Sequence, residues 1–143
     1  MIRFVLDAGV AAKWLLPAAG EELVPEATSL FRRYIRDEVH FLVPDLFWTE
    51  LANVLWKAVR QGRTSPSDAQ SAMSQALQFG FPTAPCTGLL ENALSIALRF
   101  DRTAYDSLYV ALAVASDSTL VTADQRLANA LAAHFPVRWL GSV

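Results

Sequence analysis

The stretch Ile2-Arg3-Phe4-Val5-Leu6-Asp7 is a short apolar segment that ends at an acidic residue, and it predicts a buried strand. A second such stretch, Thr119-Leu120-Val121-Thr122-Ala123-Asp124, predicts another strand with an acid just beyond it. In open α/β sheets, functional sites form beyond the carboxyl ends of the strands. We therefore expect Asp7 and Asp124 to lie at the same edge of one sheet.

Outward from these two strands, helical and strand-like segments alternate along the chain. The expected strands are residues 2–6, 41–43, 81–85, 119–122 and 137–140, and the expected helices are residues 10–16, 21–36, 44–60, 65–80, 89–100, 103–116 and 124–134. This order predicts an α/β fold, a three-layer α/β/α sandwich with a mostly parallel central sheet of about four to five strands. No linker or repeat interrupts the sequence, so we expect a single domain over residues 1–143.

The composition narrows the class of protein. Hydrophobic residues make up 53% of the 143 residues and charged residues 18%, which excludes a disordered chain and leaves apolar surface for a partner. The net charge of −2 argues against non-specific nucleic-acid binding but allows a local basic patch. The longest apolar run, Leu108–Ala115, is too short to span a membrane, and a single cysteine, Cys86, fits a reducing compartment. We therefore expect a cytoplasmic protein.

Four acidic residues stand beside apolar segments: Asp7, Glu50, Asp106 and Asp124. Each also has an ordinary structural interpretation. Asp7 and Asp124 are placed to cap the helices that follow them, Asp106 fits a capping box, and Glu50 lies on the flank of a helix where it could face water. The functional interpretation depends on all four together.

Carboxylates gathered in an apolar chain need a counter-charge, because burying an unpaired ion costs several kcal/mol. Mg²⁺ and Mn²⁺ prefer carboxylate and water oxygens. Two such ions about 3.5–4 Å apart can activate a water nucleophile and stabilise the leaving oxygen of a phosphodiester. The four acids therefore predict a metal-dependent hydrolase.

The order and spacing of these acids resemble those of the PIN-domain ribonucleases and, within them, the VapC-like toxins of type II toxin–antitoxin pairs. The matching segments are Phe4-Val5-Leu6-Asp7-Ala8 with Ala12-Lys13-Trp14-Leu15, Pro44-Asp45-Leu46 leading to Glu50-Leu51-Ala52-Asn53-Val54-Leu55, Tyr105-Asp106-Ser107-Leu108-Tyr109-Val110-Ala111-Leu112-Ala113, and Leu120-Val121-Thr122-Ala123-Asp124. Together they cover nearly the whole chain.

The resemblance implies an endoribonuclease that uses one or two Mg²⁺ or Mn²⁺ ions, forms a homodimer and is inhibited by a cognate antitoxin. It assigns the catalytic and metal-binding roles to the same four acids, which would hold the water-activating metal. It also implies that the hydroxyl of Thr122 orients a carboxylate or a metal-bound water, and that Asn53, one helical turn after Glu50, lies near the site. One departure is visible. The family commonly places Ser, Thr or Asn within two positions of the first acid, where this chain has Ala8 and Gly9.

Basic residues and tryptophans are further candidates for contacts with RNA or with a protein partner. Lys13 and Arg126 are close in sequence to Asp7 and Asp124, so we expect them to contact RNA. Trp48 and Trp56 lie off the apolar stripe of their helix, which favours a contact with the antitoxin or a second copy. Two basic turns could hold phosphates, although a solvated helix face is the usual interpretation of each. They are Arg32, Arg33 and Arg36, and Lys57, Arg60 and Arg63.

Two alternatives remain at this point. An aspartyl-phosphate phosphatase or phosphoacceptor also places an acid after its first strand, but the phosphatase would need a second Asp at position 9, which is Gly9. The other alternative is a catalytically weak or inactive PIN-like module that only mediates interactions, and the Ala8-Gly9 departure favours it.

Overall fold

The computed structural model describes residues 2–143 and has a sheet of five parallel strands at its centre. The strands are β1 (Ile2–Leu6), β2 (Val39–Pro44), β3 (Thr83–Ala84), β4 (Thr119–Thr122) and β5 (Val137–Trp139). Their order across the sheet is β3-β2-β1-β4-β5, and every neighbouring pair is parallel. The predicted three-layer α/β fold is confirmed, with the sheet wholly parallel.

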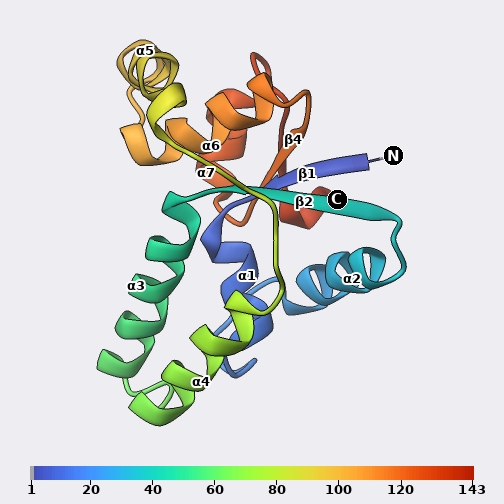
Figure 1. Cartoon of the computed structure of the whole chain (residues 1–143), viewed down its shortest axis with the longest axis vertical. Coiled ribbons are helices and arrows are strands. Elements are labelled where there is room, and N and C mark those ends of the chain that lie inside the picture. The colour runs from blue at the N-terminus through green and yellow to red at the C-terminus, as the bar shows by residue number, and fades with distance from the viewer. Residues whose placement is uncertain (1) are drawn as a thin grey trace.

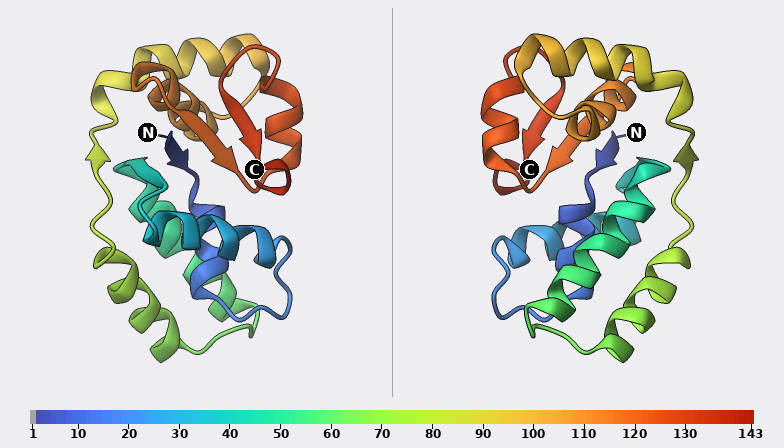
Figure 2. Two further views of the ribbon diagram at one scale, coloured as in Figure 1. Left: turned by 90° about the vertical axis from the view of Figure 1, so that its right-hand side faces the viewer. Right: turned by 90° about the vertical axis from the view of Figure 1, so that its left-hand side faces the viewer.

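Within residues 2–143, seven α-helices cover the two faces of this sheet (Figures 1 and 2). One face carries the first four helices, which are α1 (Ala8–Leu15), α2 (Val24–Ile35), α3 (Leu46–Arg60) and α4 (Pro66–Leu77). The other face carries α5 (Leu90–Phe100), α6 (Ala104–Ala115) and α7 (Gln125–Leu131). Two short 3₁₀ helices, η1 (Thr87–Leu89) and η2 (Leu140–Ser142), complete the chain. The division into two groups follows from the strand order, because right-handed connections change face when the direction across the sheet reverses.

Polar side chains start four of the helices as the sequence suggests. Asp7, Ser65, Thr103 and Asp124 each accept a hydrogen bond from a backbone N–H in the first turn that follows. Such caps satisfy donors that the helix itself leaves unpaired. Helix α3 ends before Gly62, whose φ of +72° is a conformation that glycine adopts without strain.

Helix α6 is the central helix on its face. Its residues from Ser107 to Ala113 are all buried, and it packs on β1, β2 and β4. Its amino end lies at the carboxyl edge of the sheet, because Asp106 in its first turn lines the same cavity as Asp7 and Asp124. The burial of this helix explains why it is apolar on every side.

Several element boundaries differ from those expected: β2 begins at Val39 rather than at residue 41, for example, and α4 ends at Leu77 rather than near residue 80. Helix α2 begins at Val24 rather than near Glu21, with Pro25 in its first turn. Asp45 precedes α3 but does not cap it, because its Oδ1 instead accepts a 3.2 Å hydrogen bond from the backbone N–H of Cys86. That bond fastens the start of α3 to the segment after β3. No helix within residues 2–143 has the length and apolar character needed to cross a bilayer.

Candidate active site

The two central strands bring two of the acids together. β1 and β4 are neighbours in parallel register, with Leu6 opposite Val121. The chain moves one way across the sheet from β1 to β3 and the other way from β4 to β5, so the strand order reverses between β1 and β4. Ligand sites in open α/β sheets form at such a switch point. Asp7 and Asp124 follow these two strands and lie at this place.

A cavity of about 350 Å³ opens at the switch point, and all four acids line it. They come from four separate parts of the chain: the end of β1, helix α3, the first turn of α6 and the start of α7. The full lining is Asp7, Ala8, Gly9, Glu50, Val54, Asp106, Tyr109, Leu120, Ala123, Asp124 and Leu127. The fold therefore gathers the carboxylates that the sequence singled out.

Asp7 is held by the protein through both of its carboxylate oxygens. Its Oδ1 accepts a 3.0 Å hydrogen bond from the N–H of Val10, and its Oδ2 accepts bonds from the hydroxyl of Thr122 and the N–H of Ala123. Burial nevertheless raises the pKa of Asp7, with a further contribution from the negative charge of Asp106. Asp7 is thus both a helix cap and a member of the acidic group.

Thr122 connects Asp7 with Asp124. Its fully buried hydroxyl donates to Asp7, and the same oxygen accepts a 3.0 Å hydrogen bond from the N–H of Asp124. The Oδ1 of Asp124 accepts from the N–H groups of Arg126 and Leu127, which fixes the carboxylate at the start of α7. Thr122 therefore sets the position of one carboxylate and of the backbone that carries another.

Glu50 is held by Tyr109, a residue that the sequence analysis did not assign to the site. The phenol of Tyr109 donates a 3.0 Å hydrogen bond to Oε2 of Glu50. Burial raises the pKa of Glu50, the charges of Asp7 and Asp106 raise it further, and the Tyr109 bond opposes them. The signal was present in the spacing, because Tyr109 is three residues after Asp106 and so lies on the same face of α6.

Asp106 occupies the first turn of α6. Its backbone N–H donates to the hydroxyl of Thr103, as a capping motif requires. Burial raises the pKa of the Asp106 carboxyl, and the negative charge of Asp124 raises it further. Asp106 can therefore serve both roles. Its backbone takes part in the helix cap, and the residue lines the cavity together with the other acids.

The negative charges of Asp7, Asp106 and Asp124 each raise the pKa of a neighbouring carboxyl in the cavity, so the four acids lie close enough to act on one another. Negative charge gathered in this way favours either protonation or a bound cation. Oε1 of Glu50 and Oδ2 of Asp124 accept no hydrogen bond from residues 2–143, so these two oxygens are available to coordinate a cation. The donor chemistry fits Mg²⁺ or Mn²⁺. As the side chains stand, however, no three His, Cys, Asp or Glu residues within 2–143 are arranged to hold a metal ion.

Gly9 explains part of the departure after the first acid. A Cβ atom added at Gly9 would lie 3.2 Å from Oδ1 of Asp7 and 3.7 Å from the Cβ of Ala123. The first of these distances is tighter than ordinary packing, so a side chain here would press on the Asp7 carboxylate. The absence of a side chain at Gly9 lets α1 begin directly beside the cavity.

Other candidates from the sequence lie elsewhere. Lys13 does not line the cavity, because it is further along α1 and its amine is 3.4 Å from Oε1 of Glu21. Asn53 is exposed on α3 and is also absent from the lining. Arg126 is exposed in the first turn of α7, next to Asp124. Trp48 is only half-buried and donates a 3.1 Å hydrogen bond to Thr83, whereas Trp56 is 55% exposed.

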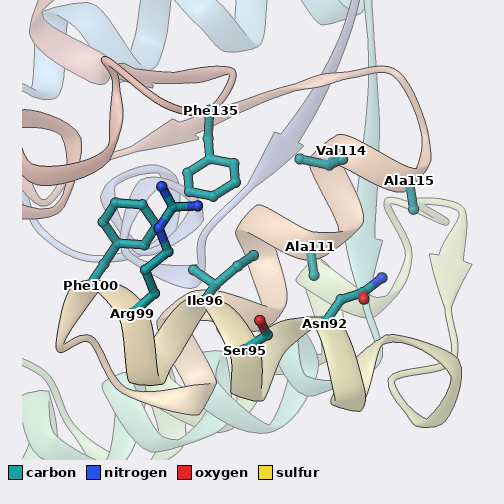
Figure 3. Close-up of a pocket in the computed structure, with 9 residues that line it drawn as sticks. All are labelled: Asn92, Ser95, Ile96, Arg99, Phe100, Ala111, Val114, Ala115 and Phe135. Carbon is teal, nitrogen blue, oxygen red and sulfur yellow. The ribbon is translucent and has the colours of Figure 1, made fainter.

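A second cavity, of about 370 Å³, lies between α5, α6 and the segment before β5 (Figure 3). Phe100, Phe135 and Ile96 form its apolar side, and Arg99 extends from α5 toward the two rings. None of its lining residues is Asp, Glu, His or Cys. It therefore lacks the groups that acid–base or metal-assisted hydrolysis would need.

Comparison with known families agrees with this fold. The sequence profile described as the PIN domain matches residues 4–131. The chain therefore belongs to the PIN-domain family.

Its curated relatives carry the name VapC. The chain is 31% identical to Ribonuclease VapC3 of Pyrobaculum aerophilum over 130 residues, which are 90% of this chain and 94% of the relative. It is 35% identical to Ribonuclease VapC9 of Mycobacterium tuberculosis over 95 residues, which are 66% of this chain and 73% of the relative. These similarities put the chain in the VapC branch of the family.

Solved structures share the fold at lower identity. PAE2754 from Pyrobaculum aerophilum superposes with a TM-score of 0.70 at 22% identity, covering 99% of this chain and 85% of that one. VapC20 of Mycobacterium tuberculosis, described as a toxin that cleaves the sarcin–ricin loop, gives 0.65 at 16% identity, with 92% and 95% covered. A toxin–antitoxin complex from Klebsiella pneumoniae gives 0.60 at 14% identity, with 94% of each chain covered.

Proposed function

We propose that this chain is a metal-dependent endoribonuclease that hydrolyses RNA phosphodiester bonds, and that it acts as the toxin of a toxin–antitoxin pair. The observation that carries the proposal is the convergence of Asp7, Glu50, Asp106 and Asp124 on one cavity at the switch point of the sheet. The names of the VapC relatives, which are ribonucleases, support the choice of RNA as substrate.

The same four acids would hold Mg²⁺ or Mn²⁺. When bound, such an ion supplies the positive charge that lowers the pKa of a water nucleophile and stabilises a departing oxygen. The raised pKa values of Asp7, Glu50 and Asp106 are consistent with a site that needs a cation to ionise fully. Both oxygens of Asp7 already accept hydrogen bonds from the protein, so a bound cation would share these oxygens with their present donors.

The remaining residues of the site orient these carboxylates. Thr122 and the N–H of Ala123 direct Asp7, the start of α7 directs Asp124, and Tyr109 directs Glu50. The partial positive charge at the amino end of α6 favours an anionic group beside Asp106. Val54, Leu120 and Leu127 give the cavity an apolar lining beside the carboxylates.

The test compares cleavage of a labelled RNA by the wild type and by Asp7→Asn, with Mg²⁺, with Mn²⁺ and with excess EDTA. We expect cleavage by the wild type with either metal, none in EDTA, and a loss of at least about 100-fold in Asp7→Asn with unchanged circular dichroism. Asp37→Asn is the matched control, because Asp37 is exposed and precedes β2 at the opposite edge of the sheet. Equal cleavage in EDTA would overturn the metal mechanism.

The same samples address the two alternative functions. An inactive PIN-like module would cleave no RNA and would gain no thermal stability from Mn²⁺. A phosphoacceptor would incorporate label from acetyl phosphate at Asp7, and Asp7→Asn would abolish that label. Either result would replace the nuclease assignment.

The protein partners proposed with this function are a cognate antitoxin and a second copy of the chain. The name of the Klebsiella complex and the VapC names of the relatives support an antitoxin. Helix α5 supports a homodimer, since Leu90, Leu94 and Leu98 are each about half or more exposed on one side of it, at 48%, 54% and 77%. Chromatography with light scattering tests the dimer, which Leu94→Glu should dissociate.

A further inference from the structure

Helix α3 connects the acid cavity with an exposed surface that the proposed active site does not use. The helix carries Glu50 into the cavity near its start and then runs away from the sheet toward α4 (Figure 1). Its outward side presents Trp56, Lys57 and Arg60, all exposed. We refer to these three residues as the α3 face.

The α3 face is positively charged in a chain that is negative overall. The net charge of the whole chain is −2, yet residues 51–67 contain three basic residues and no acidic one. Lys57 and Arg60 form no ion pair within residues 2–143. Glu21 reaches the end of this region, but it is already bound by Lys13 at 3.4 Å and by Arg63 at 2.6 Å. The charges of Lys57 and Arg60 are therefore available to an anionic partner.

Trp56 adds an aromatic surface to these charges. Its side chain is 55% exposed, and the guanidinium of Arg60 lies 5.3 Å from the centre of its ring. Aromatic side chains beside cations bind unpaired nucleotides, because a base can stack on the ring while the cation contacts the phosphate. A base in a duplex is already stacked and would not be accessible in this way.

The direction of α3 aligns this face with the cavity. Lys57 is seven residues after Glu50, which is close to two helical turns and about 10 Å along the axis. The two side chains therefore leave the helix on nearly the same side, with Asn53 exposed one turn after Glu50. Arg60 continues the charge one turn beyond Lys57. A flexible polyanion that crosses the cavity would meet these residues in succession.

We propose that the α3 face binds the single-stranded RNA that leaves the acid cavity, with Lys57 and Arg60 on phosphates and Trp56 stacked against a base. This inference rests on the proposed nuclease function, since the occupant of the face is the same RNA that the cavity cleaves. It explains how a chain of net negative charge holds a polyanion next to four carboxylates.

An apolar protein helix is the competing occupant, because a groove of about 290 Å³ between α3 and α4 borders Trp56 on its other side. That groove is lined by residues such as Ala52, Val59 and Met73 and contains no charged side chain. A helix seated there would contact Trp56 but would not account for Lys57 and Arg60, which lie off the groove. The continuity of the two cations with the cavity favours RNA.

The experiment measures binding separately from cleavage. A fluorescein-labelled, unstructured 15-nucleotide RNA is titrated with the Asp7→Asn protein, which should not cleave it, at several KCl concentrations. Adding Lys57→Ala and Arg60→Ala should weaken binding at least about tenfold and reduce the slope of log Kd against log salt by about 1.4, or 0.7 for each lost phosphate contact. Trp56→Ala should weaken binding at least about fivefold, and Trp56→Phe should restore most of it.

The matched control, Arg32→Ala with Arg36→Ala, removes one exposed arginine in α2 and one directly after it, and has the same net charge as the test variant. This control should bind as tightly as the parent. If the Lys57 and Arg60 substitutions leave both Kd and slope unchanged while the wild type still cleaves RNA, the α3 face is not the RNA surface and the nuclease proposal stands. If the wild type neither binds nor cleaves the RNA, both proposals fall. If the substitutions abolish antitoxin binding but not RNA binding, the face belongs to the protein partner and this inference is wrong.

Discussion

The hydroxyl of Tyr109 donates a 3.0 Å hydrogen bond to the carboxylate of Glu50, joining the buried helix α6 to helix α3 across the acid cavity. Burial and the charges of Glu50 and Asp7 raise the pKa of Tyr109, so the phenol stays protonated and can act only as the donor in this bond. The bond also lowers the pKa of Glu50 against the opposing effects of burial and neighbouring charge. Tyr109 thus favours the ionised form of Glu50.

Tyr109→Phe should raise the pKa of Glu50 and shift the acidic limb of the profile of kcat/KM against pH to higher pH. Stability should fall by about 1 kcal/mol, the usual net contribution of one hydrogen bond. Tyr105→Phe is the matched control, because Tyr105 is one turn earlier on α6 and 62% exposed. A profile that does not move would show that Tyr109 only packs against Glu50.

Thr122→Val should separate the orienting role of Thr122 from its size. The substitution removes the donor to Asp7 and leaves the partly buried N–H of Asp124 without its acceptor. We expect a loss of about 1–3 kcal/mol in stability and a loss of about 10- to 100-fold in metal affinity or activity. Thr122→Ser keeps the hydroxyl and should retain most activity. If valine and serine behave alike in metal titration and in the cleavage assay, the hydroxyl does not orient the site.

Stability without metal should decrease as the pH rises above the ordinary range of carboxyl groups. Asp7, Glu50 and Asp106 have pKa values in the folded state above their ordinary values of 3.8, 4.5 and 3.8. The folded protein therefore binds more protons than the unfolded chain in this window, so these groups' contribution to stability is full below pH 4 and is lost as the pH rises through the folded pKa values.

The measurement is the melting temperature in EDTA between pH 4.5 and pH 8. Asp106→Asn removes one of the repelling charges, and its melting temperature should fall less than that of the wild type over the same range. Saturating Mg²⁺ should raise the wild-type melting temperature most at the higher pH, because the carboxylates are then ionised and repel one another without the cation. A ligand at 100 times its Kd adds about 2.7 kcal/mol of stability. Parallel curves for the two proteins would contradict the repulsion.

The sequence predicted the sheet and the acids because both depend on local patterns. An apolar run followed by an acid marks a strand end, as at Asp7 and Asp124, and parallel strands place such ends at one edge. The two-residue strand Thr83–Ala84 lies within the predicted segment 81–85, and the prolines on either side of it limit its length. These features need no knowledge of distant contacts.

Partners that are distant in sequence were not predictable. Lys13 is close to Asp7 along the chain, but helix α1 carries it away from the cavity and Glu21 binds its amine. The spacing of Tyr109 from Asp106 places it on the same face of α6, but its contact with Glu50, 59 residues away, depends on how α6 packs beside α3. In both cases the tertiary packing, rather than the local pattern, decides which charge or hydroxyl the side chain meets.

Gly9→Ala should separate the stability of the protein from its activity. Helix α1 should gain up to about 1 kcal/mol from the change, because alanine is a better helix former than glycine. The new Cβ, however, would lie 3.2 Å from Oδ1 of Asp7 and would displace that carboxylate. We expect an unchanged or higher melting temperature together with weaker metal binding and slower RNA cleavage. Ala12→Gly, also within α1 but not lining the cavity, should have the opposite pattern, with lower stability and normal activity for the folded fraction. If Gly9→Ala retains full activity, the space beside Asp7 is not needed for the site, and the small residue at position 9 serves only the packing of α1.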